Sequence, residues 1–473
     1  MADNESGARN SRPSASFFHE IYDGIGLHTF VHSSADTKLL LVQRFIRIFA
    51  YGQSTLILAL FFKQLGWTDA RKGVFMTTAL FVDVPVAFLM TLFADSLGRR
   101  RTLRLAALMM TGGGVAFVLA SNYWVLLIAA TAGLISPSGT EVGPFRAIEE
   151  STIAHLTAPE VRSDIYGWYS LIGAVASALG SLSCGWIVYW LQKNGGLSNL
   201  ESYRTIYAIY TCLSLAQLAF TFFLSPACEA RESEKIAADD SNPEEDSSAQ
   251  TPLLAGRRSP SPPPEPPKIW GLIPRIAPES RAILFKLSLL IGFDSVASGI
   301  ASKSWVTYWF STTYSVPQNV LGTIFFVASI LTAFSGLAAL PVAKRIGPVK
   351  TMVFGHLPSA VLLGLVPIFP TLAWAVMCYI LRACFLHMDV APRSAFVSAI
   401  LLPGERTTVM GWLNVVKTCC QAVGPSLTGW LASTNHFGAF FIISGTMKTI
   451  YDLLILVVFS RVKTDRQGNR LWK

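Results

Sequence analysis

Residues 141–186 read EVGPFRAIEESTIAHLTAPEVRSDIYGWYSLIGAVASALGSLSCGW, and a diverged copy returns at residues 389–430 as DVAPRSAFVSAILLPGERTTVMGWLNVVKTCCQAVGPSLTGW. Both copies contain apolar sequence of membrane-spanning length, so the chain is predicted to consist of two membrane half-proteins in the same orientation. The positions that recur at one constant separation are Pro159, Arg162, Gly167, Gly180 and Gly185 in the first copy and Pro403, Arg406, Gly411, Gly424 and Gly429 in the second.

The composition agrees with a membrane protein. The chain has 473 residues, of which 52% are hydrophobic and 14% are charged, whereas soluble domains carry about 25% charged residues. The formal charge of +9 comes from basic residues at the ends of apolar runs, where they determine topology and do not indicate a nucleic-acid partner. The seven cysteines have no metal-ligand spacing, so neither a metal nor a cofactor is expected.

A helix needs about twenty apolar residues to cross the hydrocarbon of a bilayer. Six such runs precede a polar central stretch and six follow it, which predicts an all-α membrane protein with 12 transmembrane helices in two pseudo-symmetric six-helix bundles. The runs are Leu39–Phe62, Gly73–Leu97, Leu103–Ser121, Trp124–Ala147, Ile165–Leu191, Tyr203–Leu224, Ala282–Phe310, Val320–Ala343, Thr351–Phe369, Leu372–Phe396, Thr407–Leu431 and Gly438–Phe459.

The domain organisation follows from these runs. A polar tail (1–38) precedes the first bundle (39–224), and the second bundle (282–460) is followed by a short basic tail (461–473). The segment between the bundles (225–281) is acidic and then proline-rich, and such a composition predicts a disordered linker.

Lysine and arginine residues gather in the tails, in the linker and in the loops after the second and eighth runs, while the alternate loops carry almost none. The positive-inside rule therefore places both termini and the linker in the cytosol. The sequence leaves open whether the protein lies in the plasma membrane or in the vacuolar membrane.

Residues 93–101, FADSLGRRR, join the second run to the third. Asp95 ends a helix, Gly98 permits a tight reversal, and Arg99 and Arg100 can pair with an acid or with helix-end carbonyls. This loop, together with the six-plus-six arrangement, resembles the signature of the major facilitator superfamily. The resemblance implies alternating access between two bundles, with these four residues as a cytosolic latch; the alternative is that the arginines only set the topology.

Charged residues inside the apolar runs are candidates for the transport site, because each costs about 2.5–3.5 kcal/mol to insert. Counting along the helices places Asp83, Asp294, Arg382 and Lys417 near the bilayer midplane, where transporters of this kind bind their substrates. Glu141 and Asp389 occupy matching places in the repeat, each close to a proline.

The roles of these charges have two interpretations. Asp83 or Glu141 carries a proton, or the acids form structural ion pairs, since Asp389 precedes Arg393 by four residues. Asp83 has no basic residue within a helical turn, which favours its neutral form. The basic group of Arg146, Arg382 and Lys417 leaves open an anionic substrate, whereas Arg44 and Arg47 are expected to snorkel to the interface.

The sequence therefore predicts a monomeric secondary transporter in the lipid bilayer that moves a small organic solute by alternating access. Proton coupling is favoured, and efflux of an amphipathic compound is slightly favoured. The alternatives are a transporter of an organic anion or phosphate ester, and a non-transporting sensor on the same fold. An enzyme is not expected, because the chain has no nucleophile elbow, metal-ligand cluster or phosphate loop.

Overall fold

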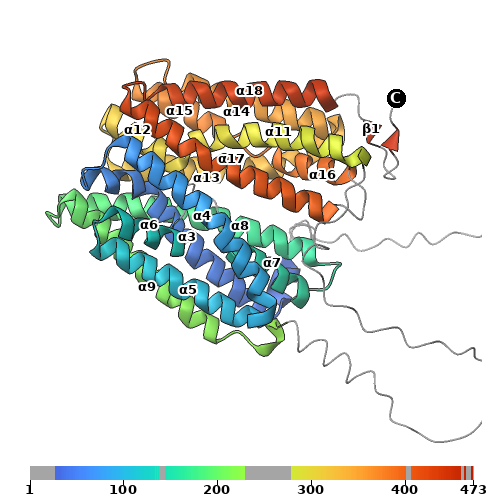
Figure 1. Ribbon diagram of the computed structural model, residues 1–473, viewed down its shortest axis with the longest axis horizontal. Helices are drawn as coiled ribbons and strands as arrows, with labels where there is room; N and C mark the ends of the chain where they lie inside the picture. Colours follow the sequence, from blue (N-terminus) through green and yellow to red (C-terminus); the bar gives the residue numbers. More distant parts are fainter. Residues whose placement is uncertain are drawn as a thin grey trace, which may run out of the picture.

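The computed structural model describes residues 27–133, 135, 137, 144–229, 278–400, 406–459, 463–464 and 470–471. Two bundles of roughly parallel helices lie against each other, and the last described residues of the first bundle and the first of the second lie on the same side (Figure 1). We call this side the linker end and the opposite side the far end.

The first bundle begins with a short helix that lies along α8, where the Phe30 and Trp168 rings are 5.1 Å apart. Its elements are α2 (Leu27–His32), α3 (Ala35–Gln64), α4 (Asp69–Leu97), α5 (Arg99–Leu119), α6 (Tyr123–Ala132), α7 (Pro144–Leu156), α8 (Arg162–Lys193), α9 (Asn199–Phe222) and the 3-10 turn η1 (Pro226–Cys228).

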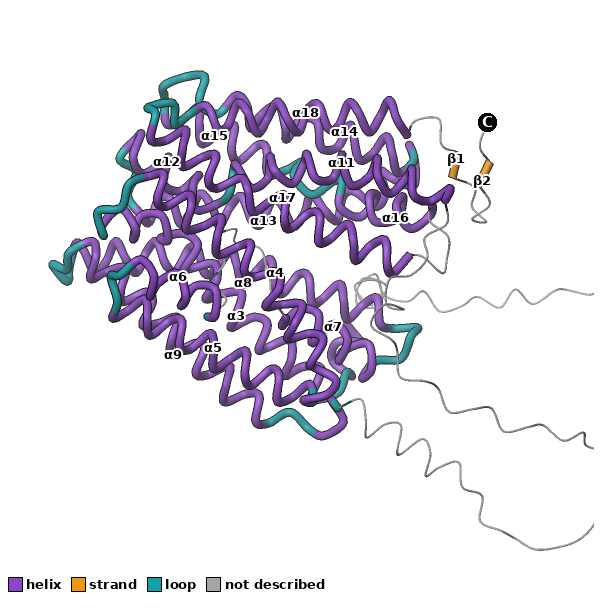
Figure 2. The backbone as a smooth tube through the Cα atoms, in the orientation of Figure 1, coloured by secondary structure: helices purple, strands orange, loops and turns teal. Residues whose placement is uncertain are grey.

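The helices of the second bundle follow a similar order. Among the described residues, the β structure is one pair of short strands near the C-terminus, each of two residues (Figure 2). The elements of this half are α11 (Pro278–Ile300), α12 (Lys303–Tyr314), α13 (Gln318–Ile346), α14 (Pro348–Leu365), α15 (Leu372–Ala383), α16 (Val390–Ile400), α17 (Arg406–Ser433), α18 (Ala439–Phe459), β1 (Lys463–Thr464) and β2 (Arg470–Leu471).

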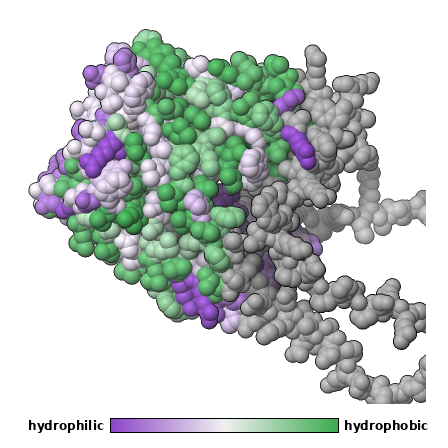
Figure 3. Space-filling view, in the orientation of Figure 1, coloured by the Kyte–Doolittle hydropathy of each residue, from purple (hydrophilic) through white to green (hydrophobic). Residues whose placement is uncertain are grey.

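The predicted all-α membrane fold is confirmed. Among the described residues, 9 helical stretches are long and apolar enough to cross a membrane, and one of them spans α11 and α12 together; α6 and α15 are shorter apolar helices. Hydrophobic residues cover much of the middle of the molecule, and hydrophilic residues gather toward the far end (Figure 3). The count of twelve spans stays a prediction, because some of the expected spans are not single helices.

The sequence was wrong in expecting one uninterrupted helix in the fourth, seventh and tenth runs. The fourth run is divided between α6 and α7, the seventh between α11 and α12, and the tenth between α15 and α16. In the tenth run the backbone passes through tight turns, with the Cys384 N–H bonded to the Leu381 carbonyl and the Phe385 N–H to the Arg382 carbonyl. Apolar residues in a turn and in a helix have the same hydropathy, so hydropathy did not reveal the breaks.

The turn between α15 and α16 is held by neighbouring helices. The His387 N–H donates to Ser335 Oγ on α13 at 3.1 Å. On α14, a Cβ at Gly355 would lie 2.8 Å from Met388 Cβ. A larger residue at Gly355 would therefore displace this turn.

The bundles touch each other near the far end, at two glycine contacts. A Cβ at Gly73 of α4 would lie 3.1 Å from the Gly429 Cα of α17, and a Cβ at Gly185 of α8 would lie 3.0 Å from the Gly322 Cα of α13. Gly185 and Gly429 are repeat-related in the sequence, so the two copies use the same position for the same close approach. Toward the linker end the bundles diverge (Figure 1).

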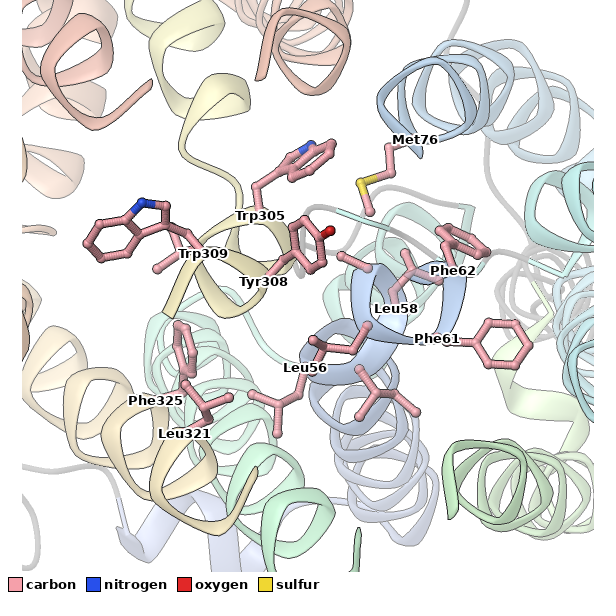
Figure 4. Close-up of a cluster of buried hydrophobic side chains, with 14 of the residues drawn as sticks. Leu56, Leu58, Phe61, Phe62, Met76, Trp305, Tyr308, Trp309, Leu321 and Phe325 are labelled. Carbon is pink, nitrogen blue, oxygen red and sulfur yellow. The ribbon is translucent and has the colours of Figure 1, made fainter. Parts of the chain in front are cut away.

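Polar and aromatic contacts complete this junction. Tyr308 Oη of α12 donates to Asp69 Oδ1 of α4 at 2.9 Å, and Lys72 Nζ donates to the same Tyr308 oxygen at 2.9 Å. Lys303 Nζ of α12 donates to Ser181 Oγ of the other bundle at 2.6 Å. Figure 4 shows how side chains of both bundles fill the space beside these contacts, among them Leu56, Leu58, Phe61, Phe62, Met76, Trp305, Tyr308, Trp309, Leu321 and Phe325.

The first five residues of the predicted linker belong to the first bundle. The Ser225 N–H donates to Asp36 Oδ1 at 2.9 Å, and its hydroxyl donates to Asp36 Oδ2 at 2.5 Å. Burial raises the pKa of the neighbouring Cys228 thiol to about 12, so this thiol stays protonated at neutral pH. Residues 230–277, which make up most of the predicted linker, lie outside the described residues.

Candidate functional site

A fully buried ion pair lies between α3 and α7 in the first bundle. Arg47 and Glu149 are joined by two hydrogen bonds of 2.7 Å each, and both side chains are 0% exposed. The Tyr169 hydroxyl donates to Glu149 Oε2 at 2.9 Å. The expectation that Arg47 snorkels to the interface is wrong: it pairs with Glu149, which lies just beyond the apolar run that the sequence predicts.

Its neighbour Arg44 also turns inward. Arg44 Nε donates to the Tyr169 carbonyl at 2.8 Å, and the guanidinium lies 3.5 Å from the centroid of the Tyr169 ring. Both arginines of the first helix therefore hold α3 against α7 and α8, which makes them structural groups of the bundle wall.

The second bundle holds a larger charge network around Asp294 on α11. Lys448 Nζ of α18 is 2.7 Å from Asp294 Oδ1, and Arg393 Nη1 of α16 is 3.5 Å from Asp294 Oδ2. Arg393 Nη2 is also 3.1 Å from Asp389 Oδ2. The ion pair between Asp389 and Arg393, one of the two interpretations of the sequence, is therefore present.

The two bundles place opposite charges at related positions. Arg393 and Glu149 have the same separation in sequence as the repeated glycines, and Asp294 lies in the first helix of its bundle as Arg47 does. In one bundle the first helix carries the cation and the fourth the acid, and in the other the order is reversed. Both bundles thus have an ion pair between their first and fourth helices, but the cation and the acid have exchanged places.

Two cations near this network have no ion-pair partner among the described residues. Lys417 on α17 is exposed, and Arg382 at the end of α15 is half-buried, with no hydrogen-bond partner for its Nε. Both are close enough to His387 to interact with it electrostatically. The network of the second bundle therefore carries a surplus of positive charge on this side.

Lys417 lies close enough to the first bundle to interact with one of its cations. It lies within electrostatic range of Arg393, Asp294 and Asp389 in its own bundle and of Arg146 in the first. Arg146 is 57% exposed on α7 and pairs with Glu150 at 2.7 Å. Lys417 on α17 and Arg146 on α7 thus bring one cation of each bundle near the other, whereas the polar and glycine contacts between the bundles lie toward the far end.

The network continues behind the site toward α14 and α18. His356 Nδ1 lies 3.1 and 3.0 Å from the two carboxylate oxygens of Asp452. Both side chains are less than 5% exposed, at 4% and 3%. Lys448, one turn before Asp452 on α18, links this pair to Asp294.

The structure describes one of the two acids that the sequence favours as proton carriers. Asp83 is 0% exposed, and neither of its carboxylate oxygens has a hydrogen-bond partner among the described residues. It lies within electrostatic range of Tyr210, which also interacts with Arg47. Glu141 lies outside the described residues.

The loop with the signature sequence is bound by an acid that the sequence did not indicate. The backbone N–H groups of Arg99 and Arg100, at the start of α5, donate to the Glu229 carboxylate at 2.7 and 3.1 Å. Gly98 has φ +91°, a backbone conformation that favours glycine. Asp95 lies in the last turn of α4, and its side chain is outside the described residues.

Replacing Glu229 with alanine is expected to lower the free energy of unfolding by about 0.5–2 kcal/mol, because the first N–H groups of α5 lose their carboxylate acceptor. The measurement is thermal unfolding of the purified chain in detergent. Glu160, an acid in the loop between α7 and α8, is the control position, and its replacement by alanine should leave the midpoint unchanged. Equal midpoints for the two variants would show that the contact at Glu229 contributes nothing.

Several site residues were missed from the sequence although the signal was present. Lys448 and Asp452 are charged residues inside the last apolar run, and His356 is a titratable residue inside the ninth. The rule that selected Asp83 and Asp294, a charge within hydrocarbon, selects Lys448 and Asp452 as well.

The structure has two helical bundles with a similar order of helices, in contact near the far end and each with buried charge pairs. This arrangement is typical of two-bundle membrane transporters. A model of the Major Facilitator Superfamily matches residues 40–293 and 287–473. The chain belongs to the major facilitator superfamily.

Two relatives are proteins of a yeast and of a bacterium. The uncharacterized membrane protein YJR124C of Saccharomyces cerevisiae is 32% identical over 445 residues, which cover 93% of this chain and 97% of that protein. The uncharacterized MFS-type transporter YceJ of Bacillus subtilis is 28% identical over 152 residues, covering 32% of this chain and 39% of that protein.

Solved transporter structures share the fold. The nucleoside transporter NupG superimposes with a TM-score of 0.63 at 14% identity and covers 91% of this chain and 100% of its own. A D-xylose-proton symporter superimposes with a TM-score of 0.63 at 14% identity and covers 92% and 99%. At this level of identity the likeness shows the fold alone.

Proposed function

We propose that this chain is a secondary transporter that carries a small organic anion, such as a carboxylate or a phosphate ester. The observation that carries this proposal is the pair of cations, Lys417 and Arg382, that have no ion-pair partner among the described residues beside an otherwise paired network. A cation without an ion-pair partner is stabilised by an anion that it can bind, and arginine binds carboxylates and phosphates through two parallel hydrogen bonds.

The contrast between the bundles supports an anion further. In the first bundle, the charge of Arg47 is matched by Glu149 inside the wall. In the second bundle, Lys417 is exposed toward the opposite bundle. In this proposal the solute contacts the second bundle through charge, and the first bundle contributes Arg146, which lies within electrostatic range of Lys417.

The end at which the bundles diverge determines which compartment the site faces in this proposal (Figure 1). The positive-inside rule places the linker and both termini in the cytosol, so we infer that this end faces the cytosol. In the proposed cycle the glycine contacts at the far end separate while the linker end closes. The anion is the substrate in this proposal, in place of the amphipathic compound that composition slightly favoured.

Replacing Lys417 or Arg382 with glutamine is expected to lower anion transport about tenfold or more, since a hydrogen bond to a charged group contributes about 1.5–3 kcal/mol and 1.4 kcal/mol corresponds to a tenfold change. The measurement is uptake of succinate and of glucose 6-phosphate into liposomes that contain the purified chain. Lys350→Gln, which removes an exposed cation at the start of α14, is the matched control and should transport as the wild type does.

A neutral amphipathic dye in the same liposomes distinguishes the competing substrate class. If the dye is transported and neither anion is, or if both glutamine variants transport the anions at the wild-type rate, the anion proposal is wrong. Absence of flux for every compound that binds would favour the non-transporting sensor.

A further inference from the structure

The buried part of the second-bundle network has an odd number of acids. Asp294, Asp389 and Asp452 contribute three negative charges, whereas Arg393 and Lys448 contribute two positive charges. His356, which pairs with Asp452, is the residue of this network whose type ordinarily titrates near neutral pH. Within this set, positive and negative charges are equal in number when both nitrogens of His356 are protonated and its ring carries one positive charge.

The geometry of His356 determines which nitrogen exchanges the proton. Nδ1 faces both oxygens of Asp452 at 3.1 and 3.0 Å, so the Nδ1 hydrogen is held by the carboxylate in either charge state. Among the described residues, Nε2 has no hydrogen bond, and Asp389 is the next acid within electrostatic range. The exchangeable proton therefore binds at Nε2.

We propose that His356 is the proton-coupling site of this transporter and that it binds one proton together with the solute anion. The inference rests on the proposed anion function for its second half. Without solute, the three acids face four cations, Arg393, Lys448, Lys417 and Arg382, so a proton on His356 would add to a surplus of one positive charge. When a divalent anion such as succinate binds Lys417 and Arg382, the sum becomes one negative charge, which the proton on His356 neutralises.

Proton and anion thus bind cooperatively, and the coupling is reciprocal: each raises the affinity for the other by the same factor. The charged groups that interact with His356 are Asp452 and Lys448 on α18, Asp389 in the turn before α16, and Asp294 on α11. The next groups of the network interact with these acids or with one another, and they are Arg393 on α16, His387 in the turn before it, Arg382 on α15, Lys417 on α17 and Tyr451 on α18.

The proton site is absent from the first bundle. Gly98 and Gly347 stand at the same place in the two bundles, each between two helices and each with positive φ. His356 lies nine residues after Gly347, and Ala107 lies nine residues after Gly98. The histidine is therefore no requirement of the repeated fold, which is consistent with a function that one bundle alone performs.

The sign of the pH dependence follows from the charge balance. At acid pH, His356 is protonated and the anion binds well; as the pH rises through the titration of His356, anion affinity falls by up to about tenfold for each pH unit, the limit for one linked proton. The affinity is measured as the KM for uptake of succinate and glucose 6-phosphate between pH 5.5 and 8.5.

Two variants give opposite expectations. In His356→Gln the network keeps three acids against two cations, so anion affinity is low at every pH. In Asp452→Asn it has two acids against two cations without a proton, so affinity is high and independent of pH. The double variant is balanced as well and should recover the affinity lost in His356→Gln. His436→Gln, at an exposed loop of the far end, is the matched control and should keep the wild-type pH profile.

A readout without solute separates this inference from the anion proposal. Thermal unfolding of the purified chain in detergent should shift to lower temperature as the pH rises, and Asp452→Asn should reduce that shift relative to His436→Gln. If the shift is present and no anion is carried, the proton site stands and the anion proposal fails. If Lys417→Gln lowers uptake while His356→Gln and Asp452→Asn keep the wild-type pH profiles of uptake and of unfolding, the proton site is wrong and the anion proposal stands.

Discussion

Replacing Glu149 with glutamine is expected to lower the free energy of unfolding by about 3–5 kcal/mol, because the buried charge of Arg47 loses the carboxylate that compensates it. Both side chains are 0% exposed and joined by two hydrogen bonds. The measurement is thermal unfolding in detergent at fixed lipid and salt. Replacing both Arg47 and Glu149 with methionine should recover most of the loss, since removing a whole buried pair is far less costly than breaking it.

The chain offers a matched control on the same helix. Arg146 and Glu150 of α7 are also 2.7 Å apart, but their side chains are 57% and 36% exposed. Glu150→Gln should cost less than about 1 kcal/mol, because exposed ion pairs contribute little. Similar losses for Glu149→Gln and Glu150→Gln would mean that burial does not set the strength of the first pair.

Replacing Gly185 with leucine is expected to open the far end. A side chain at this position meets the Gln318 carbonyl and the Gly322 Cα of the opposite bundle. Since close packing there leaves no space for a branched side chain, the bundles must separate. A shift of about 1.4 kcal/mol in the equilibrium between closed and open arrangements changes the population of the open one about tenfold.

The native thiol of Cys184, which is 0% exposed beside Gly185, reports this opening. Its labelling by a maleimide, followed on the peptide by mass spectrometry, should be about tenfold faster in Gly185→Leu than in the wild type. Gly167→Leu, on the same helix at a position where a Cβ would have nothing within 4 Å, should label as the wild type does. Equal rates in all three proteins would show that this contact does not hold the bundles together.

The repeat could be predicted from the sequence because its glycines recur at one constant separation. Gly185 and Gly429 were singled out by their constant separation, and both lie where one bundle touches the other. Glycine at such a contact reports on backbone approach directly, since any Cβ would collide with the opposite helix. The spacing therefore carried three-dimensional information before any helix was placed.

Pairing between distant charges could not be predicted in the same way. Arg47 and Glu149 meet because α3 packs beside α7. The sequence around either residue does not indicate with which residue it pairs. Counting along the first helix put Arg47 near an end, and snorkelling is the usual outcome there. The acid Glu149 lies two residues beyond the expected end of its apolar run, so it was not counted among the charges in hydrocarbon.

The candidate site was predicted in part for a related reason. Asp294, Asp389, Arg382 and Lys417 were selected as isolated charges, and the structure places all four around one network. Lys448 and Asp452 meet the same criterion, because both are charges within the last apolar run, but their positions in the sequence do not indicate their partners. The network is recognised only when the acids and bases of α11, α14, α15, α16, α17 and α18 are counted together.

The odd acid of the second-bundle network also bears on membrane voltage. A divalent anion that crosses with one proton on His356 moves one net negative charge, whereas the same anion alone would move two, and each elementary charge is worth about 2.3 kcal/mol for each 100 mV. Uptake of succinate by the wild type should therefore respond to a potassium diffusion potential. In Asp452→Asn, where no proton is needed, twice the charge moves, so the response to the same potential should be steeper.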